Sequence, residues 1–235
     1  MMTSIQKQDS WQMFNEISPK YDLLNGLLSF GIDHHWRRTI IKHLSLSGKK
    51  NILDLATGTG DVLLTLIRHE KRIIEAVGID LANNMLEIGL AKIAKQDLTQ
   101  RIQLLHGDAA HIPFENGYFE NVTIAFGIRN VSDTSVVLKE MHRVLTPNGR
   151  AIILEFSLPE NPILRMFHLF YLRTLVPCIG GLVSGHAQAY RYLNQTIETF
   201  PYGEAFCRLL REAGFAHQRA HPLMGGIATI YVGEK

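Results

Sequence analysis

The amino-acid sequence predicts an α/β fold with a seven-stranded, mainly parallel sheet and helices on both faces. Two observations lead to this prediction. Between residues 49 and 156, five short apolar segments alternate with three longer segments of helical periodicity and one loop, a pattern typical of a parallel sheet covered by helices. Near the C-terminus, two strand-like segments are joined by the turn sequence P-L-M-G-G, which predicts a closing antiparallel strand.

Periodicity and turn residues give the expected elements in order. The core strands are expected at residues 49–55, 74–79, 102–105, 121–126 and 150–156, with T-P-N-G (146–149) forming a turn before the fifth. The core helices are expected at 61–70, 82–96 and 132–145. A helix at 202–213 and strands at 216–221 and 227–232 are expected to complete the fold.

The N-terminal segment is expected to be helical and to cover the core. Trp11, Phe14 and Ile17 recur at three-residue intervals, as along one face of a helix. Pro19 is expected to start a new segment, which leads to a second helix at 33–44.

The segment 163–183 is strongly apolar, but charged and helix-breaking residues interrupt it. These are Arg165, His168, Arg173, Pro177, Gly180 and Gly181. A membrane span needs about 20 predominantly apolar residues, so we do not expect this segment to cross a membrane. A helix that covers a pocket or lies against a membrane surface fits the pattern better.

Residues 1–235 are expected to form one domain in four parts. The parts are an N-terminal helical cover (1–46), a ligand-binding core (49–157), a helical insert (158–201) and a C-terminal helix with a strand pair (202–235).

The composition is ordinary for a globular protein, since 46% of the 235 residues are hydrophobic and 20% are charged. The net charge of +2 is small and dispersed, which argues against nucleic-acid binding. Cys178 and Cys207 fit neither a disulfide framework nor a paired metal site, so we expect a reducing compartment and no metal. The first ten residues lack the apolar segment of a secretory signal.

The sequence D-L-A-T-G-T-G-D (54–61) follows the first expected strand and leads into a helix. Gly58 and Gly60 have no Cβ, so the backbone can turn tightly and approach a ligand. The helix that follows presents free N–H groups. For this loop alone, a plain structural turn is the alternative. The dinucleotide-binding pattern needs a third small residue where Leu63 stands, so that pattern is absent.

Acidic residues follow the second and third strands. Asp80 closes V-G-I-D about twenty residues after the glycine loop, where a carboxylate can accept from both hydroxyls of a ribose. At the end of the third strand, Asp108 could accept a hydrogen bond from the amino group of an adenine, while the Ala109 N–H donates to the adenine ring. Each acid alone is equally well explained as a helix cap or a solvated loop residue. Because ligands of open α/β sheets bind beyond the carboxyl ends of strands, the three strand ends together favour a ligand site. A ribose ligand without the dinucleotide-binding pattern suggests S-adenosylmethionine rather than NAD.

Longer segments carry more specific information. They are Y-D-L-L-N-G-L-L-S-F-G-I-D-H-H-W-R (21–37), F-G-I-R-N-V-S-D (126–133), L-E-F-S (154–157) and A-Y-R-Y-L (189–193). With the glycine loop, G-I-D, G-D-A-A-H-I-P-F and L-T-P-N-G, the chain resembles class I methyltransferases of the UbiE/MenG type, which methylate carbon in ubiquinone and menaquinone biosynthesis. The likeness runs from about residue 10 to the C-terminus. It implies a Rossmann-like fold and the S-adenosylmethionine-dependent methylation of a reduced polyprenyl quinone, with demethylmenaquinol slightly preferred over the ubiquinone precursor.

The resemblance also implies the cofactor residues. Thr59 matches the family's cofactor threonine, Asp80 its ribose acid, and Asp108 with Ala109 its adenine pair. The other loop positions implied to bind the cofactor are Asp54, Ala56, Gly58 and Gly60. The sequence departs from the family pattern at three positions: Ala56 and Thr57 stand where glycines are common, and Ala125 replaces a serine that can contribute to the cofactor pocket.

Arg129 and Asn130 stand directly after the fourth expected strand. Carbon is a poor nucleophile unless a neighbouring ring hydroxyl is ionised, so the implied reaction needs a group that stabilises a phenolate. Arg129 is a permanent cation with a rigid donor fork, suited to this task, and Asn130 could donate to the same oxygen. The alternative is structural: Arg129 pairs with Asp133 at the start of a helix, and Asn130 turns the chain.

Tyr21 and Asp22 belong to the specific segment 21–37 and are implied to close the site over the cofactor. The base that removes the ring proton is left open. Side chains considered for it, besides an ordered water, are Asp108, Tyr21, Asp22, His142, His168 and His186.

The substrate side is expected to be apolar. Residues expected along it are Phe167, Phe170, Tyr171 and Leu175, with Tyr190 and Arg191 lining the pocket; core packing is the alternative for all of them. A polyprenyl tail needs a groove open to the membrane, and Arg165, Arg173 and Arg191 could meet lipid headgroups. We therefore expect a cytoplasmic protein loosely associated with the inner face of the membrane, and the sequence leaves open whether it forms a homodimer or joins a biosynthetic complex.

The sequence leaves two other functions open. One is S-adenosylmethionine-dependent methylation of another small apolar or phenolic acceptor. The other is a non-catalytic scaffold that keeps the cofactor fold within a quinone-biosynthesis complex.

Overall fold

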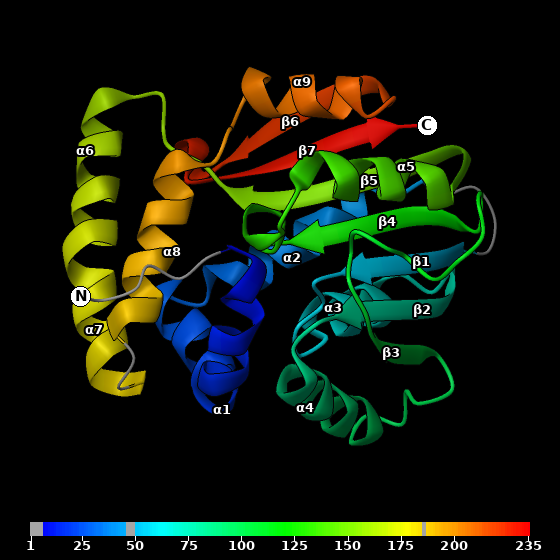
Figure 1. Cartoon of the computed structure of the whole chain (residues 1–235), viewed down its shortest axis with the longest axis horizontal. Coiled ribbons are helices and arrows are strands. Elements are labelled where there is room, and N and C mark those ends of the chain that lie inside the picture. Colours follow the sequence, from blue (N-terminus) through cyan, green and yellow to red (C-terminus); the bar gives the residue numbers. More distant parts are fainter. Residues whose placement is uncertain (1–6, 46–49, 185–186) are drawn as a thin grey trace.

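The computed structural model describes residues 7–45, 50–184 and 187–235. Its core is a seven-stranded sheet in the order β3-β2-β1-β4-β5-β7-β6. The neighbours from β3 to β5 pair in parallel, whereas β7 is antiparallel to both β5 and β6. Figure 1 shows this sheet between helices. The predicted fold class and its closing antiparallel strand are confirmed.

The strands lie close to the expected positions. Their bounds are β1 (Lys50–Leu55), β2 (Ile73–Asp80), β3 (Ile102–His106), β4 (Phe119–Ala125), β5 (Leu145–Phe156), β6 (Ala216–Leu223) and β7 (Ala228–Glu234). The expected turn at 146–149 lies inside β5 as an irregularity. Leu145 pairs with Phe119 but Arg150 pairs with Asn121, so the intervening residues bulge from the ladder, and Asn148 adopts a φ of 63° there.

Helices cover both faces of the sheet. Their bounds are α1 (Ser10–Leu28), α2 (Ile32–Thr39), α3 (Asp61–His69), α4 (Asn83–Ala94), α5 (Thr134–Val144), α6 (Pro162–Phe170), α7 (Val176–Ser184), α8 (Ala187–Thr199) and α9 (Glu204–Glu212). Short 3₁₀ turns are η1 (Lys7–Asp9), η2 (Ile40–His43), η3 (Ile128–Asn130) and η5 (Met224–Gly226). Helices α5 and α9 bury apolar side chains in one core cluster, and α2, α3 and α4 in another.

Pro19 does not start a new segment, because α1 continues through it. Proline lacks the N–H that would bond to the carbonyl of Asn15, one turn earlier. Two other donors satisfy that oxygen: the Ser18 hydroxyl at 2.9 Å and the Asn84 side-chain amide of α4 at 3.2 Å. Tertiary contact therefore replaces the lost helical bond.

The apolar segment is also more continuous than expected, because α6, a π-helical turn (η4, Tyr171–Leu175) and α7 follow one another without a break. Pro177 is the second residue of α7, separated by one residue from the π turn, whose wider pairing removes the usual conflict between a proline and the carbonyl one turn before it. A Cβ on Gly180 would stand 2.4 Å from the Tyr190 ring, so this glycine lets α8 pack closely.

Helices α1, α6, α7 and α8 form a cover beyond the carboxyl ends of the parallel strands (Figure 1). They share a third apolar cluster, in which Ile17 and Leu24 of α1 meet Leu172, Val176 and Tyr190. This cover and the strand ends enclose the space in which a ligand can bind.

Candidate active site

Two adjoining cavities lie between the strand ends and the cover. The first, which we call the loop cavity, measures about 190 Å³ and is lined by the glycine loop and the ends of β2, β3 and β4. The second, the apolar cavity, measures about 400 Å³ and lies between α1, α2, α6 and α8. Phe14, Tyr21, Phe126 and Asn130 line both. A group bound in one cavity can therefore meet a group bound in the other at this junction.

The glycine loop places backbone N–H groups beside a carboxylate. Gly58 and Gly60 have φ values of 56° and 77°, which glycine adopts at little cost. The Gly58 N–H donates to Oδ2 of Asp80 at 2.7 Å, and the Ala82 N–H donates to Oδ1 at 2.8 Å. Burial raises the pKa of Asp80, against the effect of these N–H donors. Each carboxylate oxygen keeps a lone pair for a ligand hydroxyl.

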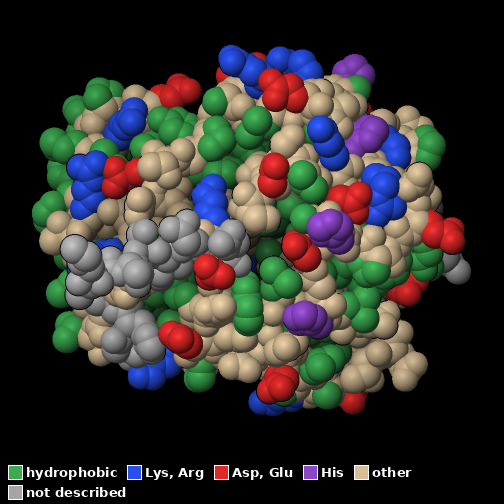
Figure 2. Space-filling view, in the orientation of Figure 1, with side chains coloured by type: hydrophobic (Ala, Val, Ile, Leu, Met, Phe, Trp, Pro, Cys, Tyr) green, Lys and Arg blue, Asp and Glu red, His purple; other side chains and the backbone are tan. Residues whose placement is uncertain are grey.

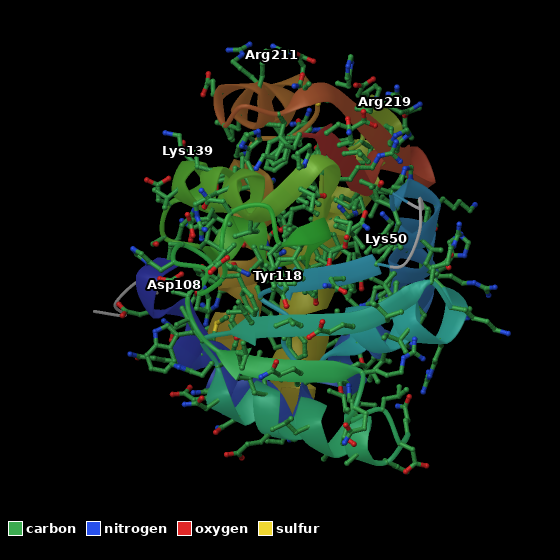
Figure 3. All side chains as sticks on the ribbon, turned by 90° about the vertical axis from the view of Figure 1, so that its right-hand side faces the viewer. Lys50, Asp108, Tyr118, Lys139, Arg211 and Arg219 are labelled. Carbon is green, nitrogen blue, oxygen red and sulfur yellow. The ribbon has the colours of Figure 1, made fainter. Side chains whose placement is uncertain are left out.

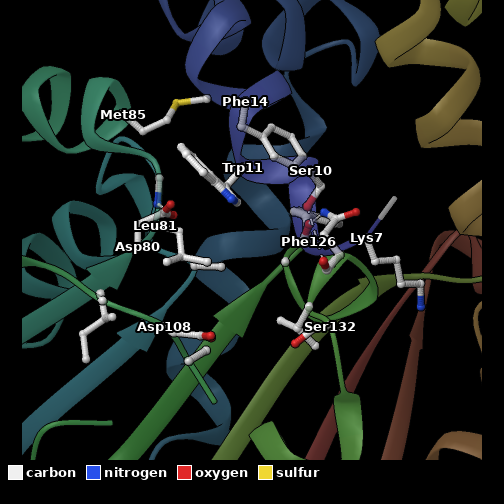
Figure 4. A pocket seen from close by; sticks show the side chains of 18 of the residues that line it. Lys7, Ser10, Trp11, Phe14, Asp80, Leu81, Met85, Asp108, Phe126 and Ser132 are labelled. Atoms are coloured by element: carbon white, nitrogen blue, oxygen red, sulfur yellow. Dashed lines mark hydrogen bonds between the residues drawn. The ribbon is translucent and has the colours of Figure 1, made fainter. Parts of the chain in front are cut away.

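Asp108 and Ala109 complete the far side of the loop cavity. Oδ1 of Asp108 accepts from the Ala110 N–H at 2.9 Å, which fixes the carboxylate at the end of β3. Figure 3 shows Asp108 on the opposite side of the molecule from Lys50, the first residue of β1. In Figure 4, Trp11 and Phe14 of α1 lie over the cavity, with Asp80 and Asp108 below them.

Asp54, Thr59 and Gly60 were implied as cofactor residues, yet they do not line the loop cavity. Asp54 is fully buried and accepts from the hydroxyls of Thr57 at 2.7 Å and Thr123 at 2.6 Å. Burial raises the pKa of Asp54 to about 7, although the two hydroxyls work in the opposite direction. Asp54 therefore shapes the loop from beneath it.

Asp22 fastens α1 to the glycine loop and does not line either cavity. Its carboxylate accepts from the Thr59 hydroxyl at 2.7 Å and pairs with Nζ of Lys92 at 2.6 Å. Lys92 also pairs with Asp61 at 2.7 Å. The expectation that Asp22 closes the site is compatible with this geometry, and its carboxylate is already engaged by Thr59 and Lys92.

Ala56 and Gly127 touch where the loop after β1 meets the loop after β4. A Cβ on Gly127 would stand 2.6 Å from Cβ of Ala56. We expect Gly127→Ala to lower the free energy of unfolding by about 1–3 kcal/mol through overpacking. In an Ala56→Gly background, less than half of that loss should remain, because the clashing atom is gone. Urea unfolding of the four proteins measures this, and an equal loss in both backgrounds would contradict the assignment.

Arg129 is almost entirely buried and pairs with Glu155 of β5, not with Asp133. Its Nη1 donates to Glu155 at 2.6 Å and to the Phe126 carbonyl at 2.7 Å. Burial raises the pKa of Glu155, while Arg129 acts in the opposite direction. Asp133 instead caps α5 by accepting from the N–H groups of Ser135 and Val136. The alternative prediction that Arg129 pairs with Asp133 is therefore wrong, because its partner is Glu155.

The apolar cavity contains unsatisfied polar atoms. Several described residues that line it have a buried side-chain atom without a hydrogen-bond partner, and these atoms include Trp36 Nε1, Arg129 Nε, Asn130 Oδ1 and His168 Nε2. Buried polar groups nearly always have partners in native proteins. Their presence in a largely apolar cavity indicates a ligand that is mostly hydrophobic and carries a few polar atoms.

The remaining predicted residues divide between the cavity and the surface. Phe167, Tyr171 and Tyr190 line the apolar cavity, whereas Arg191 is exposed and does not. Phe170 and Leu175 are also exposed and lie outside it.

The base candidates separate in the same way. Burial raises the pKa of Tyr21, which keeps its phenol protonated at neutral pH. His142 packs against Phe215, away from both cavities, and His186 lies outside the described residues. His168 is the histidine among the described residues that lines the apolar cavity.

Comparison with known proteins gives a consistent result. Residues 2–235 match the model of the ubiE/COQ5 methyltransferase family. A ubiquinone/menaquinone biosynthesis C-methyltransferase UbiE of Geotalea uraniireducens is 45% identical and covers 95% of both chains. A demethylmenaquinone methyltransferase of Thermus thermophilus is 43% identical over 95% of this chain and 100% of its own.

Solved structures share the fold at low sequence identity. An S-adenosylmethionine-dependent methyltransferase of Thermotoga maritima has a TM-score of 0.66 and 17% identity, covering 96% of this chain and 99% of its own. A phosphoethanolamine N-methyltransferase of Haemonchus contortus, solved with S-adenosylmethionine, has a TM-score of 0.62 and 14% identity, covering 85% of this chain and 52% of its own. The match over nearly the whole sequence, the sheet topology and the glycine loop agree: the chain belongs to the ubiE/COQ5 methyltransferase family.

Proposed function

We propose that this protein transfers the methyl group of S-adenosylmethionine to a ring carbon of a reduced, prenylated quinone. The observation that carries the proposal is the junction of the two cavities. The loop cavity offers carboxylates at successive strand ends, and the apolar cavity offers hydrophobic walls with unpaired polar atoms. Tyr21 and Asn130 line both.

The loop cavity fits the cofactor. Gly58 leaves room beside the loop, Asp80 has lone pairs for ribose hydroxyls, and Asp108 with Ala109 lies where an adenine ring would reach the end of β3. When bound, S-adenosylmethionine supplies an electrophilic methyl group. Trp11 and Phe14 of α1 cover the cavity (Figure 4), and the exclusion of water strengthens the polar contacts inside it.

Arg129 and Asn130 provide the means to activate the acceptor. Arg129 and Asn130 line the apolar cavity. The Nε–H of Arg129 has no hydrogen-bond partner, and this cation would stabilise the oxygen of an ionising ring hydroxyl. The side-chain N–H group of Asn130, which makes a long 3.5 Å contact with the Phe126 carbonyl, would donate to the same oxygen. Ionisation places electron density on the adjacent ring carbon. The charge of Arg129 is held in place by Glu155 and the Phe126 carbonyl, so little reorganisation is needed during the reaction.

Demethylmenaquinol is the proposed acceptor. Some similar relatives are named ubiquinone/menaquinone biosynthesis C-methyltransferases and others demethylmenaquinone methyltransferases, and menaquinone occurs in both names. In the test, purified protein is incubated with methyl-labelled S-adenosylmethionine and one of three acceptors. The acceptors are demethylmenaquinol, 2-polyprenyl-6-methoxy-1,4-benzoquinol and a phenol without a tail. Label should enter demethylmenaquinol most efficiently. Transfer to the phenol alone would favour another small acceptor, and cofactor binding without transfer to any of them would favour a scaffold.

We also propose that the substrate enters from a membrane surface. The outward side of α6 exposes Ile163, Met166, Phe167 and Phe170, each by 58% or more, and Figure 2 shows hydrophobic side chains gathered where α6 and α7 lie. Phe167 also lines the apolar cavity, so this face is continuous with its mouth. The helix Pro162–Leu182 is long and apolar enough to cross a membrane by length and composition. Because its inner side packs in the cover cluster, we propose that it lies on the bilayer, with Arg165 near the headgroups.

Flotation with anionic phospholipid vesicles tests the membrane contact. We expect Met166→Gln/Phe170→Gln to lower the bound fraction severalfold, because two side chains that would enter the bilayer become polar. Leu90→Gln, at an exposed leucine of α4, is the matched control and should float like the wild type. Equal flotation of all three proteins would contradict the proposed contact.

A further inference from the structure

His168 is a buried polar side chain that the proposed mechanism leaves unused. It lies on α6, is 93% buried, since its exposed fraction is 7%, and lines the apolar cavity. Its Nε2 has no hydrogen-bond partner. Leu164 and Leu172, one turn before and after it, line the same cavity. An imidazole in a hydrophobic wall, with a nitrogen free, can bind a polar atom of a ligand that is otherwise apolar.

Burial lowers the pKa of His168, and no charged neighbour offsets this effect. The ring is therefore neutral at physiological pH, with one nitrogen protonated and the other able to accept. If the proton is on Nδ1, Nε2 carries an unpaired lone pair.

The chemistry of the acceptor supplies a partner for that lone pair. The quinol ring of a demethylmenaquinol has two hydroxyls on opposite sides. Its open carbon, which takes the methyl group, lies between one hydroxyl and the carbon that bears the prenyl tail. The ionised hydroxyl beside the open carbon belongs with Arg129 and Asn130. The second hydroxyl stands next to the tail-bearing carbon, so its partner must come from the wall that holds the start of the tail.

We propose that His168 binds this second hydroxyl, with Nε2 accepting its proton in a hydrogen bond. This inference rests on the proposed function and adds a determinant of specificity to it. The free hydroxyl can donate to Nε2, whereas an alkyl ether at the same position cannot. Leu164 and Leu172 beside His168 would contact the tail.

The test combines variants of the protein with a modified acceptor. The variants are His168→Leu, which removes the acceptor atom, and His168→Gln, which restores a polar group at a similar reach. The acceptors are demethylmenaquinol and its monomethyl ether at the hydroxyl beside the tail. Dissociation constants are measured by the quenching of tryptophan fluorescence, since Trp36 lines the cavity and binding requires no turnover. Methyl transfer by the wild type is measured in parallel.

We expect the ether to bind wild type about 3- to 10-fold more weakly than the free quinol, the usual effect of one hydrogen bond. His168→Leu should weaken quinol binding by a similar factor and should bind quinol and ether equally. His168→Gln should recover part of both differences. Thermal unfolding and cofactor binding of each variant report on the fold.

An ether penalty of the same size in wild type and His168→Leu would overturn the proposal, because the hydroxyl would then bind elsewhere. So would the absence of any penalty in wild type. Failure of the proposed function is distinguishable: wild type would transfer no label to the quinol, whatever its binding preferences.

Discussion

Replacement of Arg129 by Gln is expected to lower kcat by about 10²- to 10³-fold, the usual effect of removing a group that stabilises a developing oxyanion. The single variant alone cannot be interpreted, because it also leaves Glu155 buried without its partner. Breaking a buried ion pair in this way costs about 3–5 kcal/mol of stability. Loss of activity could then follow simply from loss of the fold.

The double variant Arg129→Gln/Glu155→Gln separates the two effects. Both side chains are uncharged and can still hydrogen-bond, so most of the stability should return. The activity should not, because the cation proposed to stabilise the ring oxygen is gone. Steady-state kinetics, urea unfolding and cofactor binding of the wild type, both single variants and the double variant measure this. If the double variant recovers both stability and turnover, Arg129 has only a structural role.

A second large effect is expected in the pH dependence of stability. Burial raises the pKa of Asp54 from 3.8 to about 7 in the folded protein. Between these values, the unfolded chain has released the proton of Asp54 while the folded protein retains it. Stability contributed by this group therefore falls as the pH rises through this window. Between pH 5 and pH 8 the fall should amount to about 3 kcal/mol.

Asp54→Asn removes this titration but keeps groups that can bond to Thr57 and Thr123. Titrating groups that are not coupled to Asp54 act equally in both proteins, so they cancel in the comparison, whereas Asp80, whose charge raises the pKa of Asp54, does not cancel completely. Urea unfolding at both pH values should show the variant gaining relative to the wild type as the pH rises. A difference between the two proteins that stays constant with pH would mean that Asp54 titrates as it does in the unfolded chain.

The sheet and its order of elements could be predicted because they depend on patterns that are local in sequence. The alternation of apolar strands with amphipathic helices fixed the parallel core, and turn residues before Ile227 indicated the last strand. Asp80 and Asp108 could be placed at the site for the same reason, since a residue that ends a parallel strand lies at the ligand-binding edge.

Side-chain direction and long-range partners could not be predicted in this way. Motif matching placed Asp54 and Thr59 near the cofactor, but their side chains bond to Thr123 and Asp22, which only the folded chain brings close. The partner of Arg129 lies 26 residues away on β5 and becomes its neighbour through the pairing of β4 with β5. One signal was available: Glu155 is a charge that follows the apolar run 151–154 in its strand, and such a charge needs a buried partner.

Local helix-breaking rules also failed where packing opposes them. Pro19 and Pro177 lie within helices, because side chains of Ser18 and Asn84 in one case and a π turn in the other accommodate the missing N–H. His168 was considered only as a base, since its burial in an apolar wall depends on how α6 packs against the cover.

The position of the transferred methyl group tests the central claim most directly. The protein is incubated with demethylmenaquinol and S-adenosylmethionine labelled with ¹³C in its methyl group, and the product is examined by NMR. The arrangement of the two cavities, with a cation beside the ring oxygen, predicts label on the ring carbon next to the prenyl-bearing carbon. Label on a ring oxygen, or no transfer by protein that binds both ligands, would contradict the account.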